Sequence, residues 1–178
     1  MKSCVLEGMN KPTRLTDEEF EIVKNHSLYG YEMVKDNREV SDAIALGILQ
    51  HHEKIDGSGY PFGAKASQIH PYAKVISVAD IYDALVTERP YKKGYSNNDA
   101  ISILMTMTNE LDMDNLQAFL SAIILYPVDS QVCLSNGEIA QVVRRNPNLA
   151  LRPVVVGLST GEVYDLSSRE CANLTIVN

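Results

Sequence analysis

The chain has 178 residues, 45% of them hydrophobic, and a formal net charge of −7 at pH 7. Such a length and composition predict one globular domain, or one domain with a small appendage, and exclude a disordered chain. The acidic balance argues against a general DNA- or RNA-binding protein, because the affinity of such proteins comes largely from a basic surface. No apolar run reaches the roughly 18 residues that a membrane span needs. The widely spaced Cys4, Cys133 and Cys171 form no CxxC motif, which indicates reduced thiols in the cytoplasm.

The first two predicted elements are helices. Thr16 with Glu19 forms a capping-box pattern, and apolar residues then recur at helical spacing as far as Val34. A second helix is expected to start at Ser41 and to end near residues 51–53. Several glycines and a proline exclude regular structure from about 55 to 66.

Three further helices are predicted before the pattern changes. Pro71 suits the first turn of a long helix that continues to about Thr87. Ser96 with Asp99 opens a fourth helix, and the run DMDNLQAFLSAIILY predicts a fifth. We therefore expect a helical domain over residues 1–126.

After Tyr126 the residues suit short strands. The run QVCL-SNGE-IAQVVRR holds two strand-like segments around Asn136–Gly137, a strong signal for a two-residue hairpin. The runs RPVVVGL and EVYDL flank STG and predict a second hairpin. The expected fold is mainly α, with a small antiparallel β appendage over residues 127–178.

Two adjacent histidines, His51 and His52, open the segment HHEKIDGSGYP. Neighbouring helix residues point about 100° apart, so the pair suits two ions, or one site where the helix ends and loosens. A two-metal site would clamp a phosphoryl group and generate hydroxide as the nucleophile. The alternative, one helix cap and one surface histidine, is the commoner reading of an isolated pair.

Asp80 and Asp83 lie three residues apart on one face of the third helix, which is otherwise apolar almost all round. We expect this helix to be buried, and buried carboxylates need partners such as metal ions or cations. Structural salt bridges are the alternative. Arg89 and Lys92 follow on the loop, where they suit anionic groups, although two basic loop residues alone are usually solvated surface.

The other two histidines carry weaker signals. His26 is expected in the middle of the first helix, and a lone histidine there is more often packed than ligating. His70, immediately before Pro71, suits a cap or loop position.

These segments together resemble the HD-GYP family, a branch of the HD-domain metal-dependent phosphohydrolases. HHEKIDGSGYP resembles its HHE-x-x-DG-x-GYP signature. NKPTRLTDEEFEIVKNHSLYGYEMV and AKVISVADIYDALVTERPYKKGYS resemble the segments on either side, and YPVDSQVCLSNGEIAQVVRRNPNLALRPVV resembles the β extension that often closes these domains. The resemblance extends from about Asn10 onward and implies the C-terminal part of an HD-domain-like helical bundle.

The resemblance also implies residue roles. The implied metal ligands are His26, His51, His52 and Asp80. Asp83 would lie beside the reactive water and orient it or a proton donor, and Arg89 and Lys92 would hold substrate phosphate. The loop that names the family is formed by Gly57, Gly59, Tyr60 and Pro61, and it is a suspected contact for GGDEF diguanylate-cyclase domains.

The implied activity is the hydrolysis of cyclic di-GMP to pGpG or GMP in bacterial second-messenger signalling, with cyclic GMP-AMP as a further substrate of some members. The intact domain would hold two or three divalent metal ions. Iron or manganese is expected first, with zinc or nickel as alternatives, because histidine and carboxylate ligands suit all four.

The family also uses an upstream His-Asp pair in an HDxGK-like run, and no such run occurs before Asn10. We therefore expect this chain to be a truncated and inactive portion of a phosphodiesterase domain. One alternative is a degenerate, non-catalytic HD-GYP module that binds a GGDEF cyclase or a nucleotide. Another is the exchange of elements between two chains.

Overall fold

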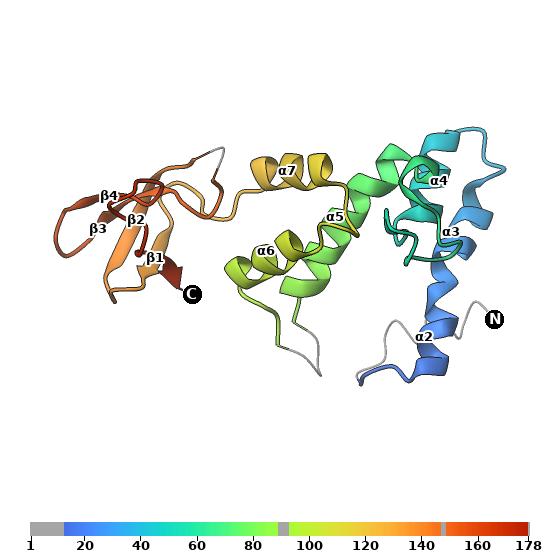
Figure 1. Ribbon diagram of the computed structural model, residues 1–178, viewed down its shortest axis with the longest axis horizontal. Helices are drawn as coiled ribbons and strands as arrows, with labels where there is room; N and C mark the ends of the chain where they lie inside the picture. Colours follow the sequence, from blue (N-terminus) through green and yellow to red (C-terminus); the bar gives the residue numbers. More distant parts are fainter. Residues whose placement is uncertain (1–12, 89–92, 147–148, 178) are drawn as a thin grey trace. The chain divides into compact units, whose positions relative to one another are not determined.

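The computed structural model describes residues 13–88, 93–146 and 149–177. Its contacts divide the chain into two compact units, Met1–Leu116 and Gln117–Asn178. Figure 1 shows helices through the first part of the chain and an antiparallel sheet toward its C-terminus, which confirms the predicted fold class. No helix in the described ranges is both long enough and apolar enough to cross a membrane.

The first predicted helix is two helices, α2 (Asp17–Lys24) and α3 (His26–Val34). Thr16 caps α2 through both hydrogen bonds of the expected capping box. The helices separate at Asn25, whose side-chain amide donates to the carbonyl groups of the last turn of α2. His26 is therefore the first residue of α3, and the expectation that it lies mid-helix was wrong.

The remaining predicted helices are present. They are α4 (Asp42–Gln50), α5 (Pro71–Val86), α6 (Asn97–Thr106) and α7 (Met113–Ala122). Ser41 and Ser96 cap α4 and α6 through their side chains, and His70 caps α5 by accepting a hydrogen bond from the Tyr72 N–H at 3.2 Å. Helix α4 packs against α3 and α5, and α5 packs against α6 (Figure 1).

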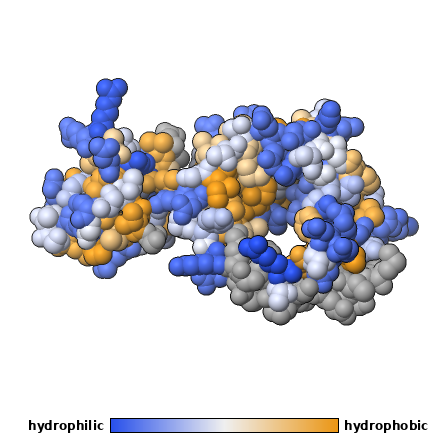
Figure 2. All heavy atoms as spheres, turned by 60° about the horizontal axis from the view of Figure 1, so that its bottom comes forward, coloured by the Kyte–Doolittle hydropathy of each residue, from blue (hydrophilic) through white to orange (hydrophobic). Residues whose placement is uncertain are grey.

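Helix α5 is less buried than its apolar sequence predicts. Only Ala73, Ser77 and Val78 are buried along it, while Val75 and Ile76 are 50% and 42% exposed. In the described part of the chain, the neighbouring helices cover only part of the α5 surface, so the expectation of a buried helix was wrong. Figure 2 shows hydrophobic residues at the surface of both units.

The second unit contains the end of α7 and a five-stranded antiparallel sheet in the order β4-β3-β2-β1-β5. Its strands are β1 (Gln131–Leu134), β2 (Ile139–Arg144), β3 (Val154–Gly157), β4 (Val163–Asp165) and β5 (Ile176–Val177). Both predicted hairpins are confirmed, with Gly137 and Gly161 at positive φ in their turns. The two-residue strand β5, which pairs with β1, was not predicted.

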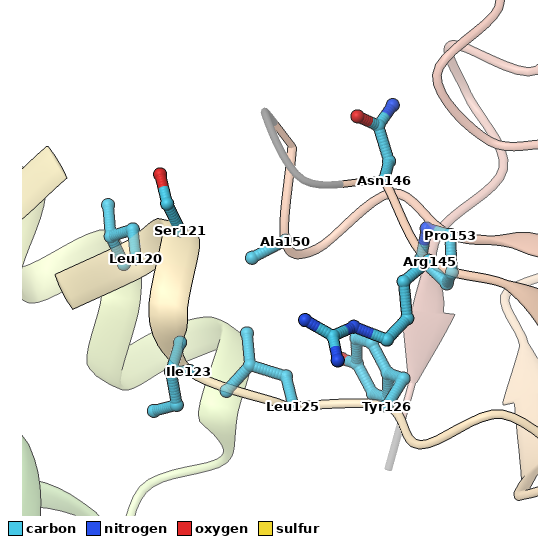
Figure 3. A pocket seen from close by; sticks show the side chains of 9 residues that line it. All are labelled: Leu120, Ser121, Ile123, Leu125, Tyr126, Arg145, Asn146, Ala150 and Pro153. Carbon is cyan, nitrogen blue, oxygen red and sulfur yellow. The ribbon is translucent and has the colours of Figure 1, made fainter. Parts of the chain in front are cut away.

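The β unit has its own hydrophobic core. Its fully buried side chains include Leu134, Val142, Val155 and Leu166. A small hollow between the end of α7 and the strands is lined by residues such as Tyr126 and is shown in Figure 3. Its volume of about 10 Å³ is close to that of a single water position, so it is too small for an organic ligand.

Candidate metal centre

Two helix ends bring three histidines together. His26 begins α3, and His51 is the C-cap of α4, with His52 directly after it. Gly30 lets α3 and α4 approach, because a Cβ at this position would lie only 2.8 Å from the Ile48 side chain. Adjacent histidines in the middle of a helix would point about 100° apart. Because α4 ends at Gln50, the backbone at His51 and His52 is not held in a regular helix, and both rings point toward His26.

For His26 and His51, the backbone fixes which ring nitrogen faces the other histidines. The Nδ1 atom of His26 lies 2.8 Å from the Val23 carbonyl oxygen, and that of His51 lies 2.7 Å from the Ile48 carbonyl oxygen. A carbonyl oxygen only accepts, so each Nδ1 carries the proton and each neutral ring directs an Nε2 lone pair inward. Backbone carbonyls commonly orient metal-binding histidines in this way.

The inward nitrogens lie at the spacing of ligands on an ion. The His26 Nε2 atom is 3.2 Å from the Nε2 atom of His51 and 3.0 Å from that of His52. Metal–nitrogen bonds of about 2.1 Å place neighbouring ligands about 3.0 Å apart at right angles and about 3.4 Å apart in a tetrahedron. The ligand atoms of all three lie within 4.8 Å of one another. The donor set therefore fits a divalent transition metal.

Burial keeps the rings of His51 and His52 neutral, which is the form of histidine that binds metal. Desolvation lowers the pKa of His51, and desolvation with the neighbouring histidines lowers the pKa of His52 to about 3. A metal ion therefore has no proton to displace from these rings near neutral pH.

The structure places Asp80 beside the histidines and Asp83 outside them. The Asp80 Oδ2 atom is 3.5 Å from Nδ1 of His52. Because His52 is neutral, this contact is a long N–H···O approach and not an ion pair. Asp83 is exposed one turn farther along α5. Arg89 and Lys92 lie outside the described residues.

The glycine-rich loop, residues 57–61, packs directly against the backbone of residues 52–54. At Gly59 an added Cβ would lie 2.4 Å from the Lys54 backbone nitrogen, so only glycine fits there. The Tyr60 N–H donates to the His52 carbonyl at 3.1 Å, and the Tyr60 ring stacks on the His52 ring at 4.6 Å. Burial, with a smaller contribution from Asp80, raises the pKa of Tyr60, so its hydroxyl stays protonated.

Two buried polar residues beside the histidines anchor the segment from residue 62 to residue 70, which follows the glycine-rich loop. Glu53, which is only 3% exposed, accepts hydrogen bonds from the backbone N–H groups of Phe62 and Ala64 at 2.7 and 2.8 Å. Gln50 accepts from the His70 N–H and donates to the Gln68 carbonyl. The end of α4 thus holds both the candidate ligands and the segment that follows the glycine-rich loop. Neither role was predicted, although Glu53 belongs to the HHE segment.

A cavity of about 310 Å³ opens beside His52 in the helical unit. Tyr60 and Ile81 line it, together with three residues that were not among the predicted site residues: Phe20, Lys24 and Lys54. Phe20 and Lys24 are four residues apart on α2 and therefore share one face. This spacing is the sequence feature that could have indicated their common position. The wall of the cavity thus contains lysine side chains and aromatic rings next to His52 of the histidine cluster.

A helical unit with a histidine cluster of this kind is characteristic of HD domains, which depend on metal ions. The HD domain family matches residues 3–115, and the chain belongs to that family. Its HHEKIDGSGYP segment and its relatives place it in the HD-GYP branch, as the sequence predicts.

Three curated relatives show the range of similar proteins. The cyclic di-GMP phosphodiesterase PA4108 of Pseudomonas aeruginosa is 40% identical over 147 residues, covering 83% of this chain and 36% of the relative. The cyclic di-GMP phosphodiesterase response regulator RpfG of Xanthomonas campestris is 39% identical, covering 57% of this chain and 27% of the relative. The 3'3'-cGAMP-specific phosphodiesterase 3 of Vibrio cholerae is 32% identical, covering 67% and 26%. The chain thus spans about a third or less of these relatives.

Proposed function

We propose that this chain supplies the histidine half of the metal centre of a cyclic dinucleotide phosphodiesterase, with cyclic di-GMP as the first substrate and 3'3'-cGAMP as the second. The observation that carries the proposal is the convergence of three Nε2 atoms beside a cavity with two lysines. The names of the relatives supply the substrate class.

The chain's own residues have distinct tasks in this proposal. His26, His51 and His52 would hold divalent metal, with Asp80 as a further ligand or as an orienting partner of His52. When bound, the metal would polarise the phosphoryl oxygen and lower the pKa of a bound water. Tyr60 packs over His52 and restricts the access of bulk water to that ring.

Three further residues act on the substrate in the proposal. Asp83 orients the attacking water or a proton donor, and Arg89 and Lys92, which follow α5 in the sequence, bind the phosphates. Iron or manganese is the expected metal, and zinc or nickel is the alternative. The product, pGpG or GMP, depends on how many phosphodiester bonds are cleaved.

A second candidate function is nucleotide binding without hydrolysis. The chain has four histidines, and none of them is followed by aspartate. The family's His-Asp pair is therefore not among these 178 residues, and we expect the chain alone to hydrolyse little cyclic di-GMP. Binding of a GGDEF domain by the glycine-rich loop and a cytoplasmic location stay predictions.

A chimera tests the proposal. Residues 10–178 would replace the matching segment of the P. aeruginosa relative, which keeps its own upstream part. We expect the metal-loaded chimera to hydrolyse cyclic di-GMP, as followed by chromatography of the products, and the His52→Ala chimera to be inactive. A folded, metal-binding chimera without hydrolysis would reject the phosphodiesterase and leave the binding function.

A further inference from the structure

The cavity beside His52 is of a size to hold part of a cyclic dinucleotide. Its volume of about 310 Å³ lies at the lower end of the roughly 300–1,000 Å³ of ligand pockets. Helix α2 forms one wall through Phe20 and Lys24, and the glycine-rich loop forms another through Tyr60. A cavity of this volume has room for one of the two nucleotides of a cyclic dinucleotide and not for both.

Lys24 is the cation in this cavity whose ion-pair partner is the more exposed to solvent. Its Nζ atom lies 4.9 Å from the Phe20 ring centre and 5.8 Å from that of Tyr60, within the range of cation–π attraction. The Lys24 side chain is 29% exposed, but its ion-pair partner, Glu21, is 68% exposed, and solvent around the carboxylate weakens such a pair. Lys54, in contrast, is paired with Glu110, and both side chains are about two-thirds buried. An anionic ligand therefore competes more easily for Lys24.

Phe20 offers the aromatic surface. It is 45% exposed although it lines the cavity, and its ring meets the Tyr60 ring edge-to-face at 6.5 Å. Tyr60 already uses one face to stack on His52. The Phe20 ring is thus the surface on which a planar base can stack, and such stacking tolerates any base because every base has a π-face.

We propose that Phe20 and Lys24 form a nucleotide subsite, in which Phe20 stacks on the base and Lys24 binds the phosphate. The subsite rests on the proposed function, because it would hold one half of the cyclic dinucleotide while the other half approaches the histidines. The subsite thus gives α2 a role in substrate recognition, in addition to the role proposed for Arg89 and Lys92.

The test measures the binding of guanosine 5'-monophosphate and of guanosine to the full chain by NMR titration, with a chelator present. Without metal, the phosphate is held by side chains alone. The variants are Lys24→Gln and Phe20→Leu. Lys35→Gln is the matched control for the first, because Lys35 also pairs with a glutamate three residues earlier, at 2.7 Å, away from the cavity. Tyr72→Leu controls for the loss of an exposed aromatic ring.

We expect Lys24→Gln to raise the Kd for the nucleotide about tenfold and to leave that for guanosine unchanged, because only the charge-assisted phosphate contact is lost. Phe20→Leu should raise both Kd values about tenfold. Both controls should behave as wild type. An unchanged Kd for the nucleotide in Lys24→Gln, or no saturable nucleotide binding to the wild-type chain, would overturn the subsite.

The subsite and the proposed function fail separately. Nucleotide binding that depends on Lys24, together with a chimera that does not hydrolyse cyclic di-GMP, would keep the subsite and reject the phosphodiesterase. A hydrolysing chimera whose KM is unchanged by Lys24→Gln would keep the phosphodiesterase and reject the subsite.

Discussion

The Nε2 atoms of His26 and His51 lie 3.2 Å apart, and the Nδ1 atom of each ring is bound to a backbone carbonyl oxygen. Neither Nε2 therefore carries a proton in the neutral ring, and two lone pairs face each other across a hydrogen-bond distance. This arrangement is unfavourable until a cation lies near both atoms. The fold of α3 and α4 thus presents a donor set that a metal ion would stabilise.

The first prediction concerns metal binding by this donor set. We expect His26→Ala to weaken metal binding by more than about a hundredfold, because losing even an outer-shell partner of a ligand costs about 10–100-fold. Elemental analysis after purification without chelators measures the bound metal per chain, and the rise in Tm on metal addition follows from linkage. His70→Ala is the matched control, since His70 caps α5 and is not part of the cluster. Equal metal content in both variants would contradict the assignment.

Local signals predicted most elements of the fold. The capping box at Thr16, the cap at Ser96 and the turn at Asn136–Gly137 are each formed by a few neighbouring residues, and the structure has each of them. Their energetics depend on contacts within three or four positions, so the sequence alone is sufficient. The strand β5 is two residues long and exists only through its pairing with β1, so no local pattern marked it.

The site was harder to predict because its contacts join distant residues. The resemblance indicated His26, His51 and His52, and the structure brings them together. The stack of Tyr60 on His52 depends on how the loop folds back, and no periodicity reports that. Likewise, the partial exposure of α5 follows from which helices pack on it and not from its apolar sequence.

The second prediction concerns the buried carboxylate of Glu53. Both of its oxygens accept from backbone N–H groups, those of Phe62 and Ala64. In Glu53→Gln one of these N–H groups would face an amide NH2 that cannot accept, so we expect the free energy of unfolding to fall by about 1–3 kcal/mol. Urea unfolding measures this, with the exposed Glu39→Gln as the control. Equal urea midpoints for the two variants would show that Glu53 does not anchor the segment that follows the glycine-rich loop.

The third prediction compares alanine substitutions at two glycines, Gly59 and Gly137. An alanine Cβ at Gly59 would lie 2.4 Å from a backbone nitrogen, whereas at Gly137 it would meet nothing within 4 Å. Gly59→Ala should therefore displace the loop, break the bond from the Tyr60 N–H to the His52 carbonyl and weaken metal binding. Gly137→Ala should cost only the roughly 1–2 kcal/mol of a positive φ and leave the metal centre intact. Hydrogen exchange at the Tyr60 amide distinguishes them: it should accelerate in Gly59→Ala alone, and equal rates in the two variants would contradict the prediction.

The fourth prediction is a pH dependence in the β unit. Glu138, in the β1–β2 turn, accepts hydrogen bonds from the hydroxyl groups of Ser159, Thr160 and Tyr164 at 2.8–2.9 Å, and so ties the two hairpins together. The bonds from Thr160 and then Tyr164 lower the pKa of Glu138 from its ordinary 4.5. The unfolded chain therefore takes up the proton at a higher pH than the folded one, and the stabilisation is complete above pH 4.5 and lost as the pH falls through the folded pKa.

The comparison of wild type with Glu138→Gln measures this contribution. We expect wild type to be more stable at pH 6.5, because the charged acceptor binds the three hydroxyl groups more strongly than an amide does. The difference should shrink as the pH falls through the folded pKa of Glu138, which lies below 4.5, because the wild-type carboxyl then also becomes neutral. Urea titration followed at the Gly157 amide by NMR reports on the sheet, since Gly157 lies on β3 beside the Glu138 carboxylate. A difference that stays the same as the pH falls would show that the charge of Glu138 contributes nothing and that only its shape and hydrogen bonds matter.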